Sequence, residues 1–223
     1  MSKALWSQVD DYVEGLFLPD DPALSETLRV SDEEGLDPIA VTPTQGKLLN
    51  LLVQMHQSKR VLELGVLGGY STICMARALP ANGQLVSLEL VAHNAAVARR
   101  NIDAAGVGDK VDIRVGAALD TLKAMVTNGE APFDFVFMDA NKDGYPEYFE
   151  QIMHLVTPGS VIIADNVIRN GAVIDEDSTE PYIVGIRKFN ELVAAEPGVT
   201  ATALQTVGSK GYDGFALLRV VSD

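Results

Sequence analysis

From residue 59 onward the sequence alternates short apolar runs with segments long enough for helices, and this rhythm restricts the fold more than any other feature. Strand, helix and strand at such spacing are typical of βαβ units, in which a parallel sheet is covered by helices on both faces. The apolar runs lie at 60–64, 84–90, 111–115, 133–138 and 160–164. The helix-like stretches between them lie near 70–79, 92–105, 117–127 and 145–156.

The C-terminal part departs from this rhythm. Two strand-like runs, 199–207 and 213–220, are separated only by Gly-Ser-Lys-Gly-Tyr. So short a connection allows an antiparallel pair but not a parallel crossover. We therefore predict an α/β fold with a doubly wound, mostly parallel sheet that ends in an antiparallel hairpin.

The first 40 residues mix apolar positions with acidic pairs and contain no strand-like run. They predict one or two surface helices, with Pro19 and Pro22 at the break between them. Thr42 followed by Pro43 then predicts the start of another helix, because Thr caps helix N-termini and Pro suits the first turn.

No linker rich in Pro, Gly or Ser divides the chain, so we expect one domain over 1–223. Within it, a helical extension (1–40) would precede the α/β core (41–223). The net charge of −14 argues against nucleic acids and anionic membranes as partners, because such surfaces are bound by Lys and Arg. The single cysteine, Cys74, forms no internal disulfide, and we see no leader-like start or membrane-spanning run. A cytoplasmic location is expected.

A glycine-rich turn follows the first apolar run, in the sequence Glu63-Leu64-Gly65-Val66-Leu67-Gly68-Gly69. Ligands of open α/β sheets bind at the carboxyl ends of the strands, where such a turn lets them approach the backbone and helix N–H groups. The spacing differs from the dinucleotide fingerprint, because Leu67 occupies the second glycine position. An ordinary tight turn is the alternative interpretation.

Two acidic residues sharpen the choice of ligand. Glu63 would lie close to the pyrophosphate of a dinucleotide, and at about 6 Å its repulsion costs about 3 kcal/mol at an effective dielectric of about 20. The same carboxylate favours an ammonium group, such as the one on S-adenosylmethionine (SAM). Glu89 lies near the end of the second run, where an acid about 20 residues beyond the turn holds ribose hydroxyls. An exposed strand-end charge is the alternative for Glu89.

Asp139 follows the fourth apolar run, and Asp165 and Asn166 follow the fifth. If these strands are neighbours, their ends lie about 4.8 Å apart and can share one ion. Two carboxylates and an amide oxygen suit Mg²⁺, or Mn²⁺ or Ca²⁺. Alternatively, the two aspartates merely cap helices. Lys142 would have a lowered pKa beside a cation and so become a usable base, unless it is a surface charge.

These residues together resemble the cation-dependent family of SAM O-methyltransferases, which includes catechol and caffeoyl-CoA O-methyltransferases. The resemblance covers the chain from about residue 38 to its end. It implies a Rossmann-like class I methyltransferase fold, whose seven-stranded, mostly parallel sheet has an antiparallel last strand. The motifs that carry it are Val41-Thr42-Pro43-Thr44-Gln45-Gly46, Val61-Leu62-Glu63-Leu64-Gly65, Gly69-Tyr70-Ser71-Thr72, Phe137-Met138-Asp139-Ala140-Asn141-Lys142 and Ala164-Asp165-Asn166-Val167.

Carried over residue by residue, the resemblance implies a cofactor site, a metal site and a base. Glu63 would hold the amino group of SAM, Ser71 its carboxylate, and Glu89 its ribose. Asp139, Asp165 and Asn166 would hold Mg²⁺, and Lys142 would act as the general base, with Asp139 beside it in the catalytic set. The residues placed around SAM are Val41, Glu63, Gly65, Tyr70, Ser71, Glu89, Ala118 and Asp139.

The implied reaction is direct methyl transfer to one hydroxyl of a small ortho-dihydroxy aromatic, of the catechol or caffeoyl type. The chain has no counterpart to the acidic residue that catechol enzymes place against the second hydroxyl, which leaves the substrate open. The segment 169–180 is predicted to form a substrate rim. We expect a homodimer that uses part of 1–40, because the apolar positions there exceed what a free helix needs. These positions are Leu5, Val9, Val13, Leu16 and Phe17.

Two alternatives belong to other classes of protein. An NAD-linked oxidoreductase is disfavoured by Glu63, by Leu67 and by the terminal hairpin. A non-catalytic ligand-binding module on the same fold is disfavoured by the complete metal set and Lys142, although a fold does not by itself decide function.

Overall fold

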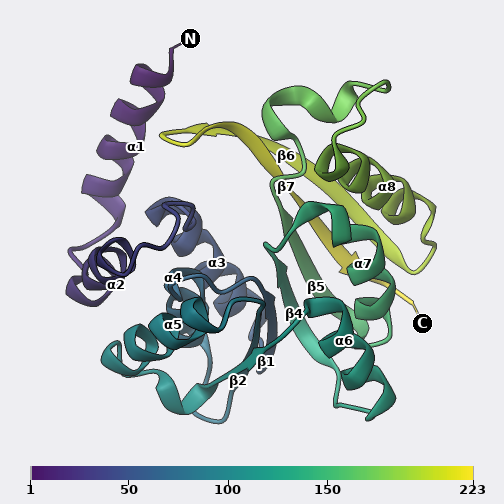
Figure 1. Ribbon diagram of the computed structural model, residues 1–223, viewed down its shortest axis with the longest axis horizontal. Coiled ribbons are helices and arrows are strands. Elements are labelled where there is room, and N and C mark those ends of the chain that lie inside the picture. The colour runs from purple at the N-terminus through teal and green to yellow at the C-terminus, as the bar shows by residue number, and fades with distance from the viewer. Residues whose placement is uncertain (1, 223) are drawn as a thin grey trace. The chain divides into compact units, whose positions relative to one another are not determined.

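The computed structural model describes residues 2–222, which fall into two compact units that meet between Ala117 and Ala118 in the sequence (Figure 1). We describe each unit by itself. The single-domain organisation expected from the sequence stays a prediction. No helix within residues 2–222 is long and apolar enough to cross a membrane.

The first unit is built on three parallel strands, with β2 between β1 and β3. Almost every residue of β1 and β2 is buried, as expected for parallel strands covered on both faces. Its strands are β1 (Arg60–Leu64), β2 (Gln84–Glu89) and β3 (Val111–Val115). Its helices are α1 (Lys3–Phe17), α2 (Pro22–Glu33), α3 (Pro43–His56), α4 (Tyr70–Ala78) and α5 (Ala92–Ala104), with a 3-10 turn at Gly108–Lys110.

Local sequence signals account for the helix starts in this unit. The Asp21 side chain accepts a hydrogen bond from the Leu24 N–H at 3.1 Å and caps α2, which begins at Pro22. The Thr42 hydroxyl caps α3 by accepting from the Gln45 N–H, while the Gln45 side chain accepts from the Thr42 N–H. The predicted break between two N-terminal helices and the predicted start of the third are confirmed.

The second unit places four strands in the order β4-β5-β7-β6. The first pair is parallel, and the other two pairs are antiparallel, which confirms the predicted C-terminal hairpin. The strands are β4 (Phe133–Met138), β5 (Val156–Asp165), β6 (Val199–Gly208) and β7 (Gly211–Val220). The helices are α6 (Ala118–Thr127), α7 (Tyr145–Met153) and α8 (Pro181–Ala195), with 3-10 turns at Lys142–Gly144 and Arg169–Ile174.

Two features of this unit differ from the prediction. The turn of the hairpin is shorter than the expected connection, since Gly208 already pairs with Gly211. Helix α8 was not predicted, and part of the expected loop at 169–180 is a 3-10 turn. The buried residues Ile183, Ile186 and Phe189 recur at helical spacing, a signal that could have identified α8.

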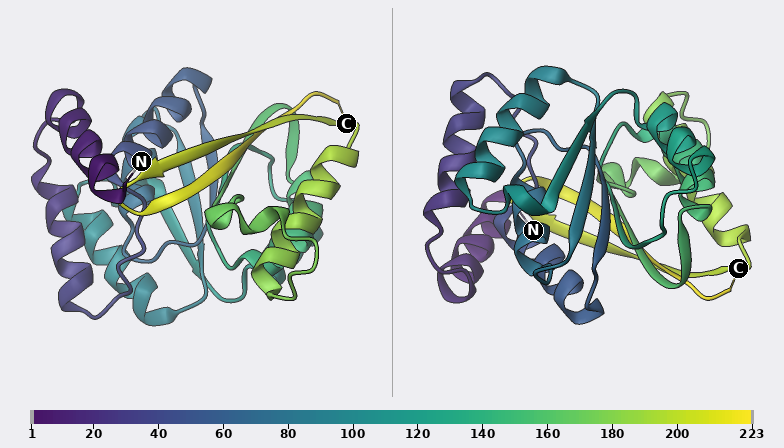
Figure 2. Two further views of the ribbon diagram at one scale, coloured as in Figure 1. Left: turned by 90° about the horizontal axis from the view of Figure 1, so that it is seen from above. Right: turned by 90° about the horizontal axis from the view of Figure 1, so that it is seen from below.

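Helices α6, α7 and α8 lie on one side of the strands of this unit in all three views (Figures 1 and 2). Tyr145 and Phe149 of α7 meet the Phe189 ring of α8 edge to face, with ring centroids 5.5 Å and 5.6 Å apart. Gly185 of α8 approaches the turn after β4, where an added Cβ would overlap the carbonyl group of Lys142. Helix α8 thus presses directly on the turn that carries Lys142.

Replacing Gly185 by alanine should therefore destabilise the protein by about 1–3 kcal/mol, because the overlapping atom is backbone and the helix must shift. Gly15 of α1 is the matched control, since an added Cβ there meets nothing within 4 Å. Gly15→Ala should stabilise the protein by about 0.5–1 kcal/mol through helix propensity. Urea unfolding of both variants measures the difference, and equal effects would contradict this account of α8.

Candidate active site

The carboxylate of Glu63 in β1 is enclosed by hydroxyl groups. Ser71 and Thr72 of α4 donate to its two oxygens at 2.6 Å each, and Ser87 of β2 donates at 2.7 Å. The residue is 0% exposed, so these donors satisfy a charge that would otherwise be costly to bury. The Ser71 hydroxyl, expected to hold the cofactor carboxylate, is directed at Glu63 instead, and both cofactor roles stay predictions.

Glu89, at the end of β2, is tied to the glycine turn. One of its oxygens accepts from the N–H groups of Val66 and Leu67 at 3.0 Å each, and the other accepts from the Val91 N–H at 2.9 Å. The residue is buried, so the exposed strand-end charge considered as an alternative is wrong. Its predicted contact with ribose stays a prediction, but the carboxylate clearly organises the turn.

Backbone conformation and close packing explain why glycine occupies three positions of this turn. Gly65 and Gly69 have φ angles of 92° and 86°, in the left-handed region that favours glycine. At Gly68 an added Cβ would overlap the Ser31 hydroxyl of α2, so the N-terminal extension packs directly on the turn. Leu67 adopts φ 51°, a strained value that is typical of functional loops.

The other residues expected around the cofactor lie in different places. Val41 is buried just before the cap of α3, and Tyr70 begins α4. Gly69 is the N-cap residue of that helix. Ala118 is the first residue of α6 in the second unit.

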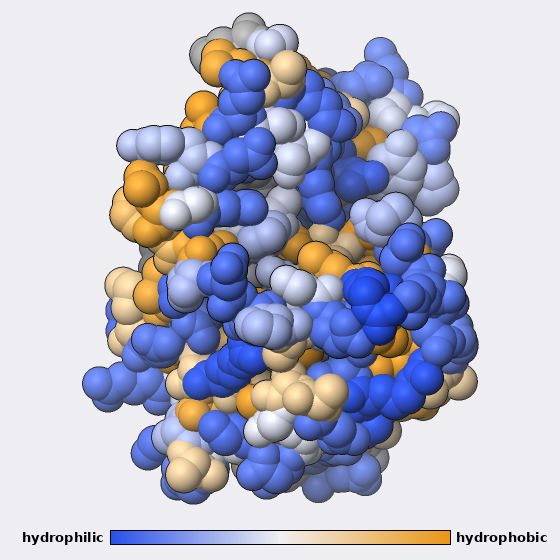
Figure 3. Space-filling model, turned by 90° about the vertical axis from the view of Figure 1, so that its left-hand side faces the viewer, coloured by the Kyte–Doolittle hydropathy of each residue, from blue (hydrophilic) through white to orange (hydrophobic). Residues whose placement is uncertain are grey.

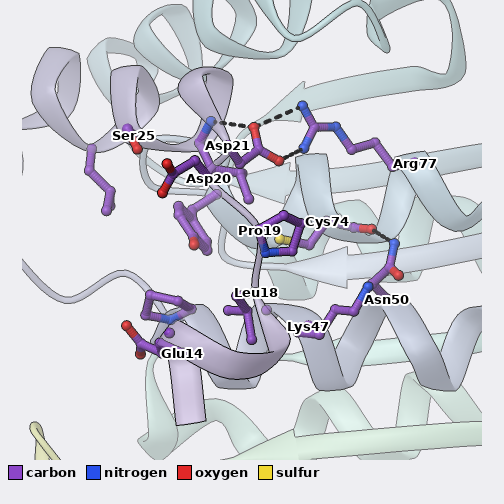
Figure 4. Close-up of a pocket in the computed structure, with 16 residues that line it drawn as sticks. Glu14, Leu18, Pro19, Asp20, Asp21, Ser25, Lys47, Asn50, Cys74 and Arg77 are labelled. Carbon is purple, nitrogen blue, oxygen red and sulfur yellow. Dashed lines mark hydrogen bonds and ion pairs between the residues drawn. The ribbon is translucent and has the colours of Figure 1, made fainter. Parts of the chain in front are cut away.

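A cavity of ≈450 Å³ lies among α1, α2, α3 and α4 of the first unit (Figure 4). Asp21 forms an ion pair with Arg77 at its wall, and the Asn50 amide donates to the Cys74 carbonyl at 2.8 Å. Burial raises the pKa of the Cys74 thiol to about 12, so this cysteine is no nucleophile. Of the predicted cofactor residues only Tyr70 lines the cavity, which is therefore distinct from the turn at Glu63 and Glu89.

In the second unit, the register of β4 and β5 brings the predicted acidic residues together. Met138 pairs with Ala164, so Asp139 and Asp165 follow side by side at the ends of neighbouring parallel strands. The prediction that these strands are neighbours is confirmed. Asp165 is buried, and its burial together with the charge of Asp139 raises its pKa to about 7.

Lys142 supplies a positive charge beside these carboxylates. Its ammonium group donates to Asp139 Oδ1 at 2.7 Å, and its side chain is only 10% exposed, so it is not the surface lysine considered as an alternative. Burial favours the neutral amine, but Tyr145 and Asp139 outweigh that effect and raise the pKa of Lys142. The lowered pKa of Lys142 that we predicted applies to a protein with a bound cation, and it stays a prediction.

Asn166, the third expected metal ligand, has φ 58° and donates its N–H to Asp165 Oδ1 at 2.8 Å. Its backbone thus turns sharply at the carboxylate. Within residues 2–222 no three His, Cys, Asp or Glu side chains gather as a metal site. The predicted ligand set of Asp139, Asp165 and Asn166 is not of that kind, because it combines two carboxylates with an amide.

Sequence reasoning missed three residues of this region. The Tyr145 hydroxyl donates to backbone carbonyls at the ends of both strands. Asp213 of β7 holds the loop after Asn166 by accepting from the N–H groups of Ile168 and Arg169 at 3.2 Å and 2.8 Å. Lys210, in the hairpin turn, interacts electrostatically with Asp139 and Asp165, which partly oppose the lowering of its pKa by burial. Asp213 and Lys210 come from elements distant in sequence, so no local motif reveals them. Tyr145 follows Lys142 by three residues, but its contact with the end of β5 depends on the packing of α7.

Comparison with known proteins identifies the class. The sequence profile of the O-methyltransferase family matches residues 17–220. A catechol O-methyltransferase of Niastella koreensis is 50% identical over 99% of this chain and 100% of its own length. The crystal structure of an O-methyltransferase from Bacillus cereus in complex with SAH superposes with a TM-score of 0.97, at 50% identity, over 98% of this chain and 100% of that one. The O-methyltransferase TomG from Streptomyces achromogenes, in complex with SAM, gives 0.96 at 45% identity over 100% of both chains.

The fold and the matched profile thus define a methyltransferase of the Rossmann-like class. The chain belongs to the O-methyltransferase family, and its enzyme class is that of a SAM-dependent O-methyltransferase. The predicted family, fold class and enzyme class are confirmed, and the alternative of an NAD-linked oxidoreductase is wrong.

The raised pKa of Asp165 predicts how stability depends on pH. Between pH about 4 and about 7 the folded protein keeps a proton that the unfolded chain releases, so the metal-free protein should lose stability as the pH rises through this window. In the presence of a chelator, Asp165→Asn should therefore be more stable than the wild type by about 1–3 kcal/mol at pH 8, with little difference at pH 4.

Asp109→Asn is the matched control for this prediction, because it removes the same charge from an exposed residue of the first unit. Urea unfolding at the two pH values measures the free energies. A pH-independent effect of Asp165→Asn, equal to that of the control, would show that Asp165 carries no unfavourable buried charge.

Proposed function

We propose that the protein is a divalent-metal-dependent O-methyltransferase that methylates one hydroxyl of a small ortho-dihydroxy aromatic compound. The observation that carries this proposal is the pairing of Asp139 with Asp165 at adjacent strand ends, with the Lys142 ammonium hydrogen-bonded to Asp139. It is supported by the 50% identity of the chain to a catechol O-methyltransferase.

The charges of the acidic cluster suit a divalent cation. Asp165 is only 6% exposed and faces the charge of Asp139. Of the two carboxylates, it is Asp139 that forms an ion pair with Lys142. Asp139, Asp165 and Asn166 would hold the ion, and their hard oxygen donors suit Mg²⁺ first and Mn²⁺ or Ca²⁺ second. The bound ion would act as a Lewis acid that favours ionisation of the acceptor hydroxyl.

For the cofactor we propose SAM, held mainly by residues of the first unit. The buried charge of Glu63 attracts the ammonium group, and the N-terminus of α4, beginning at Tyr70 and Ser71, receives the carboxylate. Glu89 would bind the ribose while it holds the turn. Val41 and Gly65 would contribute backbone groups.

In this mechanism a bound divalent cation would lower the pKa of Lys142, so that its neutral amine could take the proton of the acceptor hydroxyl at Nζ. Asp139 would orient the amine through its hydrogen bond. The phenolate oxygen then attacks the sulfonium methyl group in line. The C–S bond breaks as the O–C bond forms, and the thioether leaves with its electron pair. Alignment of the two reactants supplies much of the acceleration.

The decisive test incubates the purified protein with labelled SAM and a panel of ortho-diphenols. We expect methyl transfer that a chelator abolishes and that Mg²⁺ restores, together with calorimetric binding of SAM. Asp165→Asn should lose activity, whereas the exposed control Asp109→Asn should keep it. Lys142→Ala should lower turnover by about 10²–10⁴-fold, with partial recovery at higher pH.

Each arm can contradict a different part of the proposal. Methyl transfer that resists chelation would refute the metal, and a Lys142→Ala enzyme with normal turnover at neutral pH would refute the base. Binding of SAM without transfer to any diphenol would refute the proposed class of acceptor.

We also propose a cytoplasmic homodimer whose contact includes α1. No residue of α1 is buried, and Tyr12, Leu16 and Phe17 are exposed by 67%, 59% and 69%. Apolar side chains lie among hydrophilic ones on the side of the molecule that carries α1 in Figure 1 (Figure 3). Several exposed apolar side chains on one helix are typical of an interaction site. The reduced, buried Cys74 agrees with the cytoplasm.

Light scattering at micromolar concentration should give twice the 23.9 kDa of one chain. Leu16→Lys should shift the mass towards that of the monomer, because it places a charge in the apolar contact. Gln8→Lys, at another exposed position of α1, is the control that should leave the mass unchanged. A monomeric wild type would refute the dimer.

A further inference from the structure

Tyr145, the first residue of α7, lies between the ends of β4 and β5, which carry the acidic cluster of Asp139 and Asp165. Its hydroxyl is 2.7 Å from the carbonyl oxygen of Met138 and 3.0 Å from that of Asp165. Met138 is the last residue of β4, directly before Asp139, and Asp165 is the last residue of β5. A hydroxyl has one proton to donate, so the two carbonyls share a single donor placed between them.

The ring of Tyr145 is held on several sides. The residue is 0% exposed, and the Phe189 ring meets it edge to face with centroids 5.5 Å apart. The Lys142 ammonium lies 5.0 Å from the centroid of the Tyr145 ring. One side chain therefore contacts the base and the backbone at both carboxylates, and its packing leaves the hydroxyl little freedom to move.

Packing alone does not explain the hydroxyl. Phenylalanine would fill the same space, and burying a hydroxyl is costly unless it finds a partner. Its partners are the Lys142 side chain and carbonyls of two different strands, at the point where their paired region stops after Met138 and Ala164. The hydroxyl thus links the strands where the side chains of the acidic cluster begin.

We propose that Tyr145 is a positioning residue, whose hydroxyl sets the separation of the backbone at Asp139 and Asp165 so that both carboxylates reach one divalent cation. The inference rests on the proposed function. It follows from the strict demands of such ions, since Mg²⁺ accepts ligands only near about 2.1 Å and in octahedral directions. Groups that orient ligands from behind typically change metal affinity by about 10–100-fold when removed.

The test measures binding of Mn²⁺ alone to the metal-free full-length protein by calorimetry, without SAM or acceptor. Tyr145→Phe should weaken Mn²⁺ binding by about tenfold or more. Tyr148→Phe is the matched control: it removes the hydroxyl of another buried tyrosine on the same helix, whose partner is the Asn141 side chain. This control should bind Mn²⁺ within about twofold of the wild type.

Urea unfolding of both variants separates positioning from stability. A purely structural hydroxyl would lower stability in Tyr145→Phe and leave Mn²⁺ affinity unchanged at a temperature where the protein is folded, and that result would overturn the inference while the proposed function stands. A wild type that binds no divalent cation would overturn both. A loss of affinity as large in Tyr148→Phe as in Tyr145→Phe would also overturn the inference.

A second variant keeps the proposal testable if Tyr145→Phe does not fold. Site-specific replacement of Tyr145 by 3-fluorotyrosine preserves its shape and hydroxyl but strengthens the hydroxyl as a donor. Mn²⁺ affinity should then change by about twofold or more, because the strand ends are held differently. An unchanged affinity in this folded variant would overturn the positioning role.

Discussion

The parallel pairing of β4 and β5 is the constraint on which the chemistry of the second unit depends. It places Asp139 and Asp165 side by side, where two negative charges repel each other in a buried setting. Neighbouring groups partly offset this repulsion. Lys142 bonds to Asp139, and the Asn166 N–H donates to Asp165. Tyr145 holds the carbonyls beneath both acids.

The buried carboxylates of the first unit are held by uncharged hydrogen-bond donors. Glu63 accepts from hydroxyl groups and Glu89 from backbone N–H groups. Neutral donors satisfy the hydrogen bonds of a carboxylate without adding a positive charge of their own. Two buried acidic groups beside the glycine turn suit a cationic ligand. The acidity of the chain is thus consistent with a cofactor that carries both an ammonium and a sulfonium group.

The two helices of the N-terminal extension have different roles. Its second helix packs on the glycine turn, where Gly68 leaves room for the Ser31 hydroxyl and Leu36 lies nearby. Its first helix buries none of its residues. The second helix of the extension therefore supports the glycine turn, whereas the first helix exposes apolar side chains. Removing the extension would take away packing from the glycine turn.

By itself the sequence determined the strands, most of the helices and the candidate residues, because these follow from local periodicity, capping at Thr42 and motifs at strand ends. Only the tertiary structure decided how those residues are held. The hydroxyls around Glu63, the tie between Glu89 and the turn, and the contacts of Tyr145 and Asp213 all join different elements. Burial, which raises the pKa of Asp165, also depends on packing of the whole unit. Local patterns specify which groups are present at a strand end, whereas the distances between groups arise when separate elements pack together.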